Sequence, residues 1–138
     1  MKNLIYFLSL LFLMACNSSI IEKIEETHPD NSKKIVRFYQ KQEGKEKLLE
    51  EKHFYQNGKL KMHGKFLNGK RTGEWKSYFA NDQLQSSGTF INGIRTGEVK
   101  VYQPNGTLIY EGFYEGGKQV GHWKFYTKEG RLAKEEDF

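Results

Sequence analysis

The sequence predicts an all-β fold, an elongated antiparallel meander of β-hairpin repeats. Residues recur at a step of 24 with no insertion, which is typical of a repeat architecture. Glycines follow the same step, and a turn-forming pair such as Asn57-Gly58 occurs in each unit. The recurring leucines are Leu60, Leu84, Leu108 and Leu132. Each unit is therefore expected to form one hairpin, and stacking the units extends the sheet in one direction.

The first 15 residues are expected to be removed as a signal peptide. Lys2 precedes an apolar run over residues 4–14, and a bilayer span needs about 20 apolar residues. A charged start, a short apolar run and a small residue at the cut describe a secretory signal. The string Leu13-Met14-Ala15-Cys16 resembles the lipobox of bacterial lipoproteins. This resemblance implies cleavage before Cys16 and a lipid on its thiol; the alternative is an ordinary signal peptide with an incidental cysteine.

A lipidated Cys16 would anchor the chain to a membrane of the bacterial cell envelope, since two or three acyl chains bind a bilayer very stably. Asn17-Ser18-Ser19 lacks the early acidic cluster of some surface-exported lipoproteins, which favours an outer-membrane location facing the periplasm. Residues 16–32 are expected to be a lipidated tether with at most a helical turn or two, ended at His28-Pro29. The repeat domain is expected over residues 33–138, with a first strand at residues 35–40.

Asn-Gly between alternating runs is the strongest short-range signal for a hairpin with a two-residue loop. If Asn57 and Gly58 form the loop, paired residues have numbers that sum to 115, and the next three hairpins have sums of 163, 211 and 259. One face is then apolar, with large rings opposite glycines. Its expected pairs are Tyr55–Leu60, His53–Met62, Glu51–Gly64, Leu49–Phe66, Phe79–Leu84, Trp75–Gly88, Gly73–Phe90, Val99–Gly112, Gly97–Tyr114 and Gly121–Phe138.

The opposite face is expected to be polar, with a regular row of rings and lysines. Its expected pairs are Phe54–Lys61, Lys52–His63, Tyr78–Gln85, Lys100–Glu111, Tyr102–Ile109, Lys124–Glu135 and Tyr126–Ala133. Tyrosine and phenylalanine lose little entropy on contact, and lysines attract an acidic partner. The candidate binding face therefore consists of Phe54, Tyr78, Tyr102, Tyr126, Lys52, Lys76, Lys100 and Lys124. Alternatively, the rings only cover lysine stems and stiffen a solvated sheet.

Two segments, Gly64 to Trp75 and Tyr110 to Trp123, resemble the MORN repeat, and more closely its bacterial variant in YwqK-type antitoxin proteins. The resemblance covers about residues 54–138. It departs from the family pattern at Asp82 (for a turn glycine), Val99 (for the tryptophan) and Glu136 (for a repeat glycine). The family implies a hairpin-repeat sheet used for protein or membrane association. It implies no defined catalytic residues.

Other chemistry is disfavoured by the pattern. A lone cysteine excludes a disulfide framework and a cysteine-based zinc site. His53 and His63 are expected on opposite faces, so no metal site is expected. Gly64 to Lys70 has the spacing of a phosphate-binding loop, but Arg71 takes the place of the Ser/Thr and the spacing recurs with the repeat. No cofactor is expected.

The sequence thus predicts a non-enzymatic, membrane-anchored lipoprotein that acts as a protein-interaction module. The first alternative is an immunity or antitoxin protein that neutralises a secreted toxin, and the second is a cell-envelope hydrolase. From Cys16 onward the formal net charge of +5 falls to +4, because only Lys2 leaves with the signal peptide. This charge also suits an anionic envelope polymer or lipid headgroup, whereas export argues against nucleic acid. If the ring and lysine row does not bind, the connections around Arg71, Arg95 and Gln119, or the edge at residues 131–138, are the next candidates.

Overall fold

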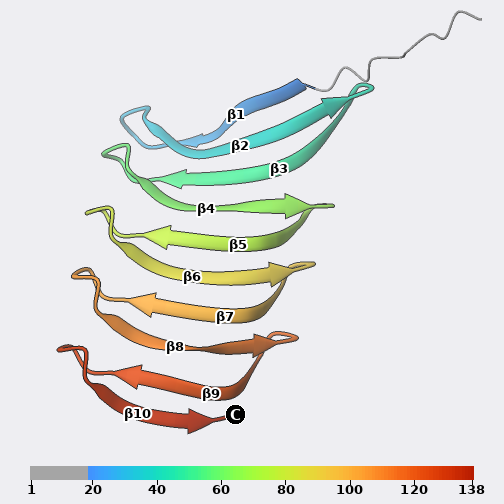
Figure 1. Ribbon diagram of the computed structural model, residues 1–138. Coiled ribbons are helices and arrows are strands. Elements are labelled where there is room, and N and C mark those ends of the chain that lie inside the picture. The colour runs from blue at the N-terminus through green and yellow to red at the C-terminus, as the bar shows by residue number, and fades with distance from the viewer. Residues whose placement is uncertain (1–18) are drawn as a thin grey trace, which may run out of the picture.

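The computed structural model describes residues 19–138 as one sheet of ten antiparallel strands, each paired with its neighbours in the chain (Figure 1). The expected all-β meander is confirmed. The expected signal peptide and Cys16 lie outside the described residues. The strands are β1 (Ser19–Thr27), β2 (Lys33–Gln42), β3 (Lys45–Phe54), β4 (Leu60–Leu67), β5 (Lys70–Tyr78), β6 (Leu84–Ile91), β7 (Ile94–Tyr102), β8 (Leu108–Glu115), β9 (Lys118–Tyr126) and β10 (Leu132–Asp137).

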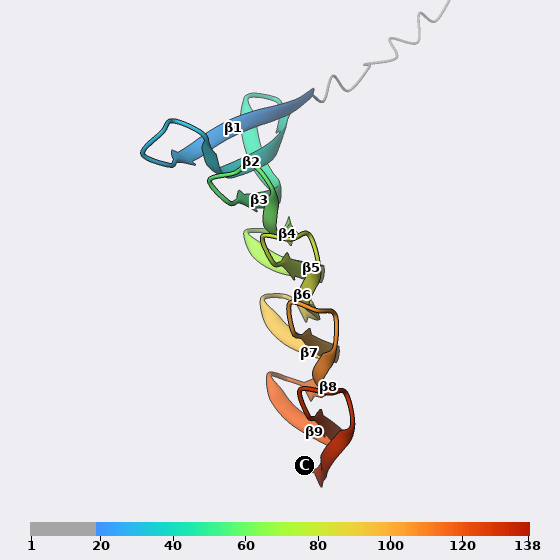
Figure 2. The same cartoon turned by 90° about the vertical axis from the view of Figure 1, so that its left-hand side faces the viewer.

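The sheet is a single layer along its length. Seen along its edge, the hairpins succeed one another like steps, and no described element lies over either face (Figure 2). Few side chains are therefore buried: the buried apolar residues among 19–138 are Val36, Trp75, Val99 and Trp123. A one-layer sheet leaves two broad faces open to other molecules.

The expected tether over residues 16–32 is wrong in part, because residues 19–27 form β1, which pairs with β2. Charged side chains of β1 form ion pairs with β2 and β3. Glu22 pairs with Lys33 of β2 and Lys23 pairs with Glu46 of β3, both at 2.6 Å. His28-Pro29 is not a helix stop. It opens a turn in which the amide of Asn31 donates to the carbonyl of His28.

The turns that contain Asn57-Gly58 and its equivalents are not the expected two-residue loops. The Gly58 amide donates to the Tyr55 carbonyl and the Tyr55 amide to the Lys59 carbonyl, so the loop has three residues. Among the three loop residues only Gly58 has a positive φ, at 80°. This pattern is that of a type I turn followed by a left-handed residue. Pro104 occupies the first loop position of the third such turn, where a type I turn favours proline.

Two-residue loops occur instead at the other connection of each unit. Asn68 and Gly69, with φ of 51° and 74°, join β4 to β5, and Asn92 and Gly93 join β6 to β7 in the same way. Both central residues have a positive φ, as a type I′ turn requires. The Asn-Gly signal therefore predicts a hairpin at both places and cannot choose between the two loop types.

The register of each hairpin body is as predicted, because a bulge compensates for the longer loop. Trp75 pairs with Gly88, Val99 with Gly112 and Lys52 with His63. Next to the turn the expected pairs are wrong: Tyr55–Leu60, Phe79–Leu84, Phe54–Lys61, Tyr78–Gln85, Tyr102–Ile109 and Tyr126–Ala133 do not form. Leucines instead face the row of rings, in the pairs Phe54–Leu60, Tyr78–Leu84, Tyr102–Leu108 and Tyr126–Leu132.

Candidate functional site

One face of the sheet, here called the tyrosine–lysine face, carries the predicted row. Along β5, Lys76 and Tyr78 alternate with Trp75 and Ser77, so the lysine and the tyrosine share a face. The equivalent residues of β3, β7 and β9 repeat this arrangement. All eight predicted residues are partly exposed: Phe54, Tyr78, Tyr102, Tyr126, Lys52, Lys76, Lys100 and Lys124. Their assembly into one row was predictable from the 24-residue step.

The row is internally bonded, which the sequence did not reveal. Lys76 pairs with Glu74 and Lys100 with Glu98, both at 2.8 Å. These hydrogen bonds raise the pKa of both lysines above the usual value, so the amines stay charged. The Tyr126 hydroxyl donates to Glu111 at 2.8 Å, and this hydrogen bond raises the pKa of Tyr126. The face therefore presents rings and paired charges at fixed positions.

The opposite face, here called the tryptophan face, holds the buried side chains. The indole of Trp75 lies over Gly64 of β4 and that of Trp123 over Gly112 of β8; in each case an added Cβ would collide with the indole. The indole of Trp75 thus covers a glycine of the preceding strand β4, and not Gly88, its pairing partner on β6. Each indole also donates a hydrogen bond to a backbone carbonyl at 3.2 Å.

Glu51 takes the tryptophan position in the first hairpin, one 24-residue step before Trp75, and is only 5% exposed. Its carboxylate accepts hydrogen bonds from Arg37 at 2.7 Å and from His53 at 2.8 Å. Burial by itself would raise the pKa of Glu51, but the bonds to His53 and Arg37 outweigh it and hold the pKa below the ordinary 4.5. A bonded carboxylate here replaces an aromatic ring.

The stabilisation from Glu51 is expected to be pH-dependent. A carboxyl with a lowered folded-state pKa stabilises the fold above its ordinary pKa, and this stabilisation is lost as the pH falls through the folded-state pKa. Glu51→Gln should lower the melting temperature at neutral pH and flatten its decline below about pH 4.5. Thermal unfolding followed by circular dichroism across this pH range measures both effects. Glu50→Gln, on the same strand and opposite face, is the matched control, and an equal effect from it would contradict the assignment.

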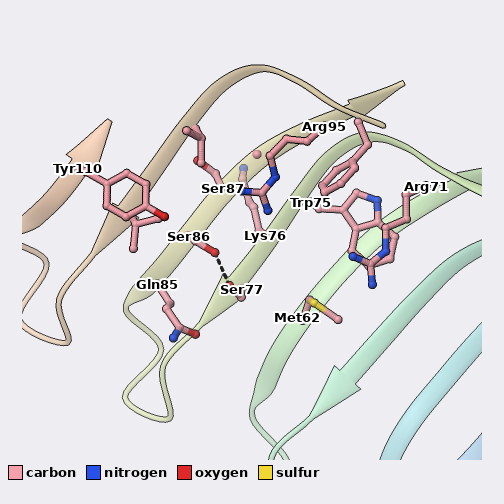
Figure 3. Close-up of a pocket in the computed structure, with 14 residues that line it drawn as sticks. Met62, Arg71, Trp75, Lys76, Ser77, Gln85, Ser86, Ser87, Arg95 and Tyr110 are labelled. Atoms are coloured by element: carbon pink, nitrogen blue, oxygen red, sulfur yellow. Dashed lines mark hydrogen bonds between the residues drawn. The ribbon is translucent and has the colours of Figure 1, made fainter. Parts of the chain in front are cut away.

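A hollow of about 330 Å³ opens on the tryptophan face over β5, β6 and β7 (Figure 3). Trp75 and Arg71 lie on one side and Tyr110 on the other, and hydrogen-bonded Ser77 and Ser86 lie between them (Figure 3). Sequence reasoning missed this hollow. The departure of Val99 from the tryptophan pattern was the available signal.

Arginine and aromatic side chains alternate along one side of the hollow. The Arg71 guanidinium lies 4.1 Å from the centre of the Trp75 ring. The Arg95 guanidinium lies 5.4 Å from the Phe90 ring and 5.3 Å from the Tyr114 ring. Such stacks are cation–π interactions, which arginine favours. They place two positive charges beside the aromatic rings of the tryptophan face.

The comparison with protein families agrees with this geometry. The family model described as MORN repeat variant matches residues 47–68, 71–92 and 95–115. Residues 47–115 thus contain three tandem matches to this family model. MORN repeats suggest a protein-interaction module. No curated protein and no solved structure matched the chain.

The three MORN repeats differ at the tryptophan position of the tryptophan face. The first repeat has Glu51, the second Trp75 and the third Val99, while Trp123 lies beyond the matched residues. The hairpin geometry nevertheless continues to β10, with Phe138 bonded to Gly121 through backbone groups. The hollow lies where the second and third MORN repeats meet.

His53 and His63 lie on opposite faces, as predicted. His53 bonds to Glu51 on the tryptophan face, and His63 stacks on Tyr78 on the other. Within residues 19–138, no group of three or more histidine, cysteine, aspartate or glutamate side chains is placed to hold a metal ion. The same part of the chain has no helix long and apolar enough to cross a bilayer.

Proposed function

We propose that this protein is a non-enzymatic, membrane-anchored module that captures a protein partner through its tyrosine–lysine face. The observation that carries the proposal is the row of four rings and four lysines on an open face of a one-layer MORN sheet. Equivalent residues of alternate strands are about 9.6 Å apart, twice the strand spacing. A partner that lies across the strands would meet the same ring and charge in each unit.

The bonds within the row favour a binding role because they hold the side chains in place before a partner arrives. Tyr78 stacks on His63 with ring centres 6.0 Å apart, and the Tyr126 hydroxyl donates to Glu111 at 2.8 Å. Ordered side chains lose less entropy on association, and tyrosines supply much of the binding energy of many interfaces. The lysines favour a partner with an acidic surface.

The double change Tyr78→Ala with Tyr102→Ala is expected to abolish capture of the partner, since it removes two adjacent rings from the middle of the row. Capture is measured by pulldown from solubilised envelopes, as recovery of the protein band that the wild-type module retains. Circular dichroism should stay close to that of the wild type, because both rings are partly exposed. The matched control, Tyr78→Phe with Tyr102→Phe, keeps the rings and should retain capture. Capture by the folded alanine variant would contradict this site.

The membrane anchor is proposed to be a lipid on Cys16. The support is the string Leu13-Met14-Ala15-Cys16 together with the absence of any other cysteine from the sequence. Cys16→Ser should move the protein from the membrane fraction to the soluble fraction. The measurement is fractionation after a high-salt wash, with the N-terminus determined by mass spectrometry. A serine variant that lacks its first 15 residues and still stays on membranes would rule out lipidation.

A further inference from the structure

The tryptophan face has a ring-sized space where the third MORN repeat lacks its tryptophan. Trp75 covers Gly64 and Trp123 covers Gly112, but Gly88, although buried, has the side chains of Arg95 and Val99 beside it in place of an indole. The nearest atom to a Cβ added at Gly88 would be Cζ of Arg95, 3.8 Å away. Val99 is itself only 1% exposed, so the space lies above a packed floor.

The size of the space suits an aromatic ring. The hollow of about 330 Å³ is lined by Trp75, Phe90, Val99, Val101 and Tyr110. A cavity of about 150 Å³ already holds a benzene ring. An indole or phenol would therefore fit with part of its own backbone.

The repeat itself indicates how a ring would be held. In the second repeat, the rings of Trp75 and Phe66 pack edge to face with their centres 5.4 Å apart, and Arg71 lies over the face of Trp75. Phe90 and Arg95 stand one 24-residue step later, beside the empty space. A guest ring above Gly88 would meet the same two kinds of neighbour.

The charge of the hollow selects an acidic ligand. The 14 residues that line it include Arg71 and Arg95 and no aspartate or glutamate. Within residues 19–138, neither arginine has a carboxylate within ion-pair distance. A guanidinium stacked on a ring keeps its N–H edge available, and that edge matches a carboxylate.

We propose that this hollow binds one aromatic side chain of an acidic peptide segment in a partner protein. The ring lies in the hollow beside Gly88, where the third repeat lacks an indole, and carboxylates next to the ring in the peptide pair with Arg71 and Arg95. The proposal goes beyond capture by the tyrosine–lysine face, because the site is on the opposite face and recognises a different chemistry.

The test uses the full-length chain in detergent and the synthetic peptide acetyl-Glu-Trp-Glu-amide, followed by the backbone amide NMR signals of the protein. Saturable shifts are expected at Gly88, Phe90 and Arg95. Replacing the peptide's tryptophan by alanine, or both its glutamates by lysine, should weaken binding at least about tenfold. Val99→Trp should fill the space and abolish these shifts. Arg71→Gln with Arg95→Gln removes both positive charges of the hollow and leaves Val99 unchanged, and it should weaken binding by a similar factor.

Several outcomes would overturn the proposal. Unchanged binding to folded Val99→Trp would place the peptide elsewhere, and equal binding of the alanine peptide would leave only charge attraction. Binding of indole-3-acetate at Gly88 without binding of the peptide would indicate a small aromatic acid as the ligand. The Tyr78→Ala, Tyr102→Ala variant should bind the peptide as the wild type does. Failure of the tyrosine–lysine face and failure of the hollow are thereby told apart.

Discussion

Trp123→Ala is expected to unfold the C-terminal hairpin and to lower the melting temperature strongly. Trp123 is 1% exposed, and its ring contacts those of Tyr110, Tyr114, Phe125 and Phe138. Truncation of a buried tryptophan costs about 3–5 kcal/mol, which is a large share of the stability of a small domain. The loss falls at the end of the sheet, where β10 has only β9 as a neighbour, so few contacts remain to compensate.

Thermal unfolding and amide hydrogen exchange of β9 and β10 measure this effect. Phe113→Ala is the matched control, because Phe113 is also an aromatic residue of the last hairpins but is 51% exposed. Its cost is expected to stay within about 0.5 kcal/mol. A shift of only a degree or two for Trp123→Ala would mean that the tryptophan face does not hold the sheet together.

Gly112→Ala and Gly88→Ala are expected to have opposite effects, although both glycines lie at equivalent positions. A methyl group on Gly112 would collide with the indole of Trp123, which is buried and has no space to retreat. Overpacking of this kind costs about 1–3 kcal/mol, and occasionally more. At Gly88 the methyl group meets the flexible end of Arg95 at 3.8 Å and a methyl group of Val99 at 4.0 Å, both at ordinary contact distance. Neither glycine has a positive φ, so alanine adopts both backbones.

Gly88→Ala should therefore leave stability unchanged or raise it by about 0.4–1 kcal/mol, since alanine reduces the freedom of the unfolded chain. Chemical unfolding of the two variants and of Gly64→Ala, which repeats the collision with Trp75, provides the comparison. Equal destabilisation by Gly88→Ala and Gly112→Ala would show that the space above Gly88 is closed in solution.

The sequence alone determined the repeat, the strand order and the faces of the hairpin bodies. These are local properties: a 24-residue step, a turn in each unit, and alternation that places Trp75 and Lys76 on opposite faces. The predicted ring and lysine row followed from the same parity. The compensating bulges explain why this parity survived wrong loop types, since a longer loop and one extra strand residue restore the same pairs.

The tertiary structure decided what depends on the neighbouring strand. Asn57-Gly58 and Asn68-Gly69 are the same pair of residues, yet only the second forms a two-residue loop, because pairing across the hairpin selects the turn. Residues 19–27 became a strand because β2 offers them a partner edge and opposite charges. The hollow on the tryptophan face also depends on a neighbouring strand. It exists because each indole covers a glycine on the preceding strand, so a valine at position 99 leaves a space whose place only the assembled sheet reveals.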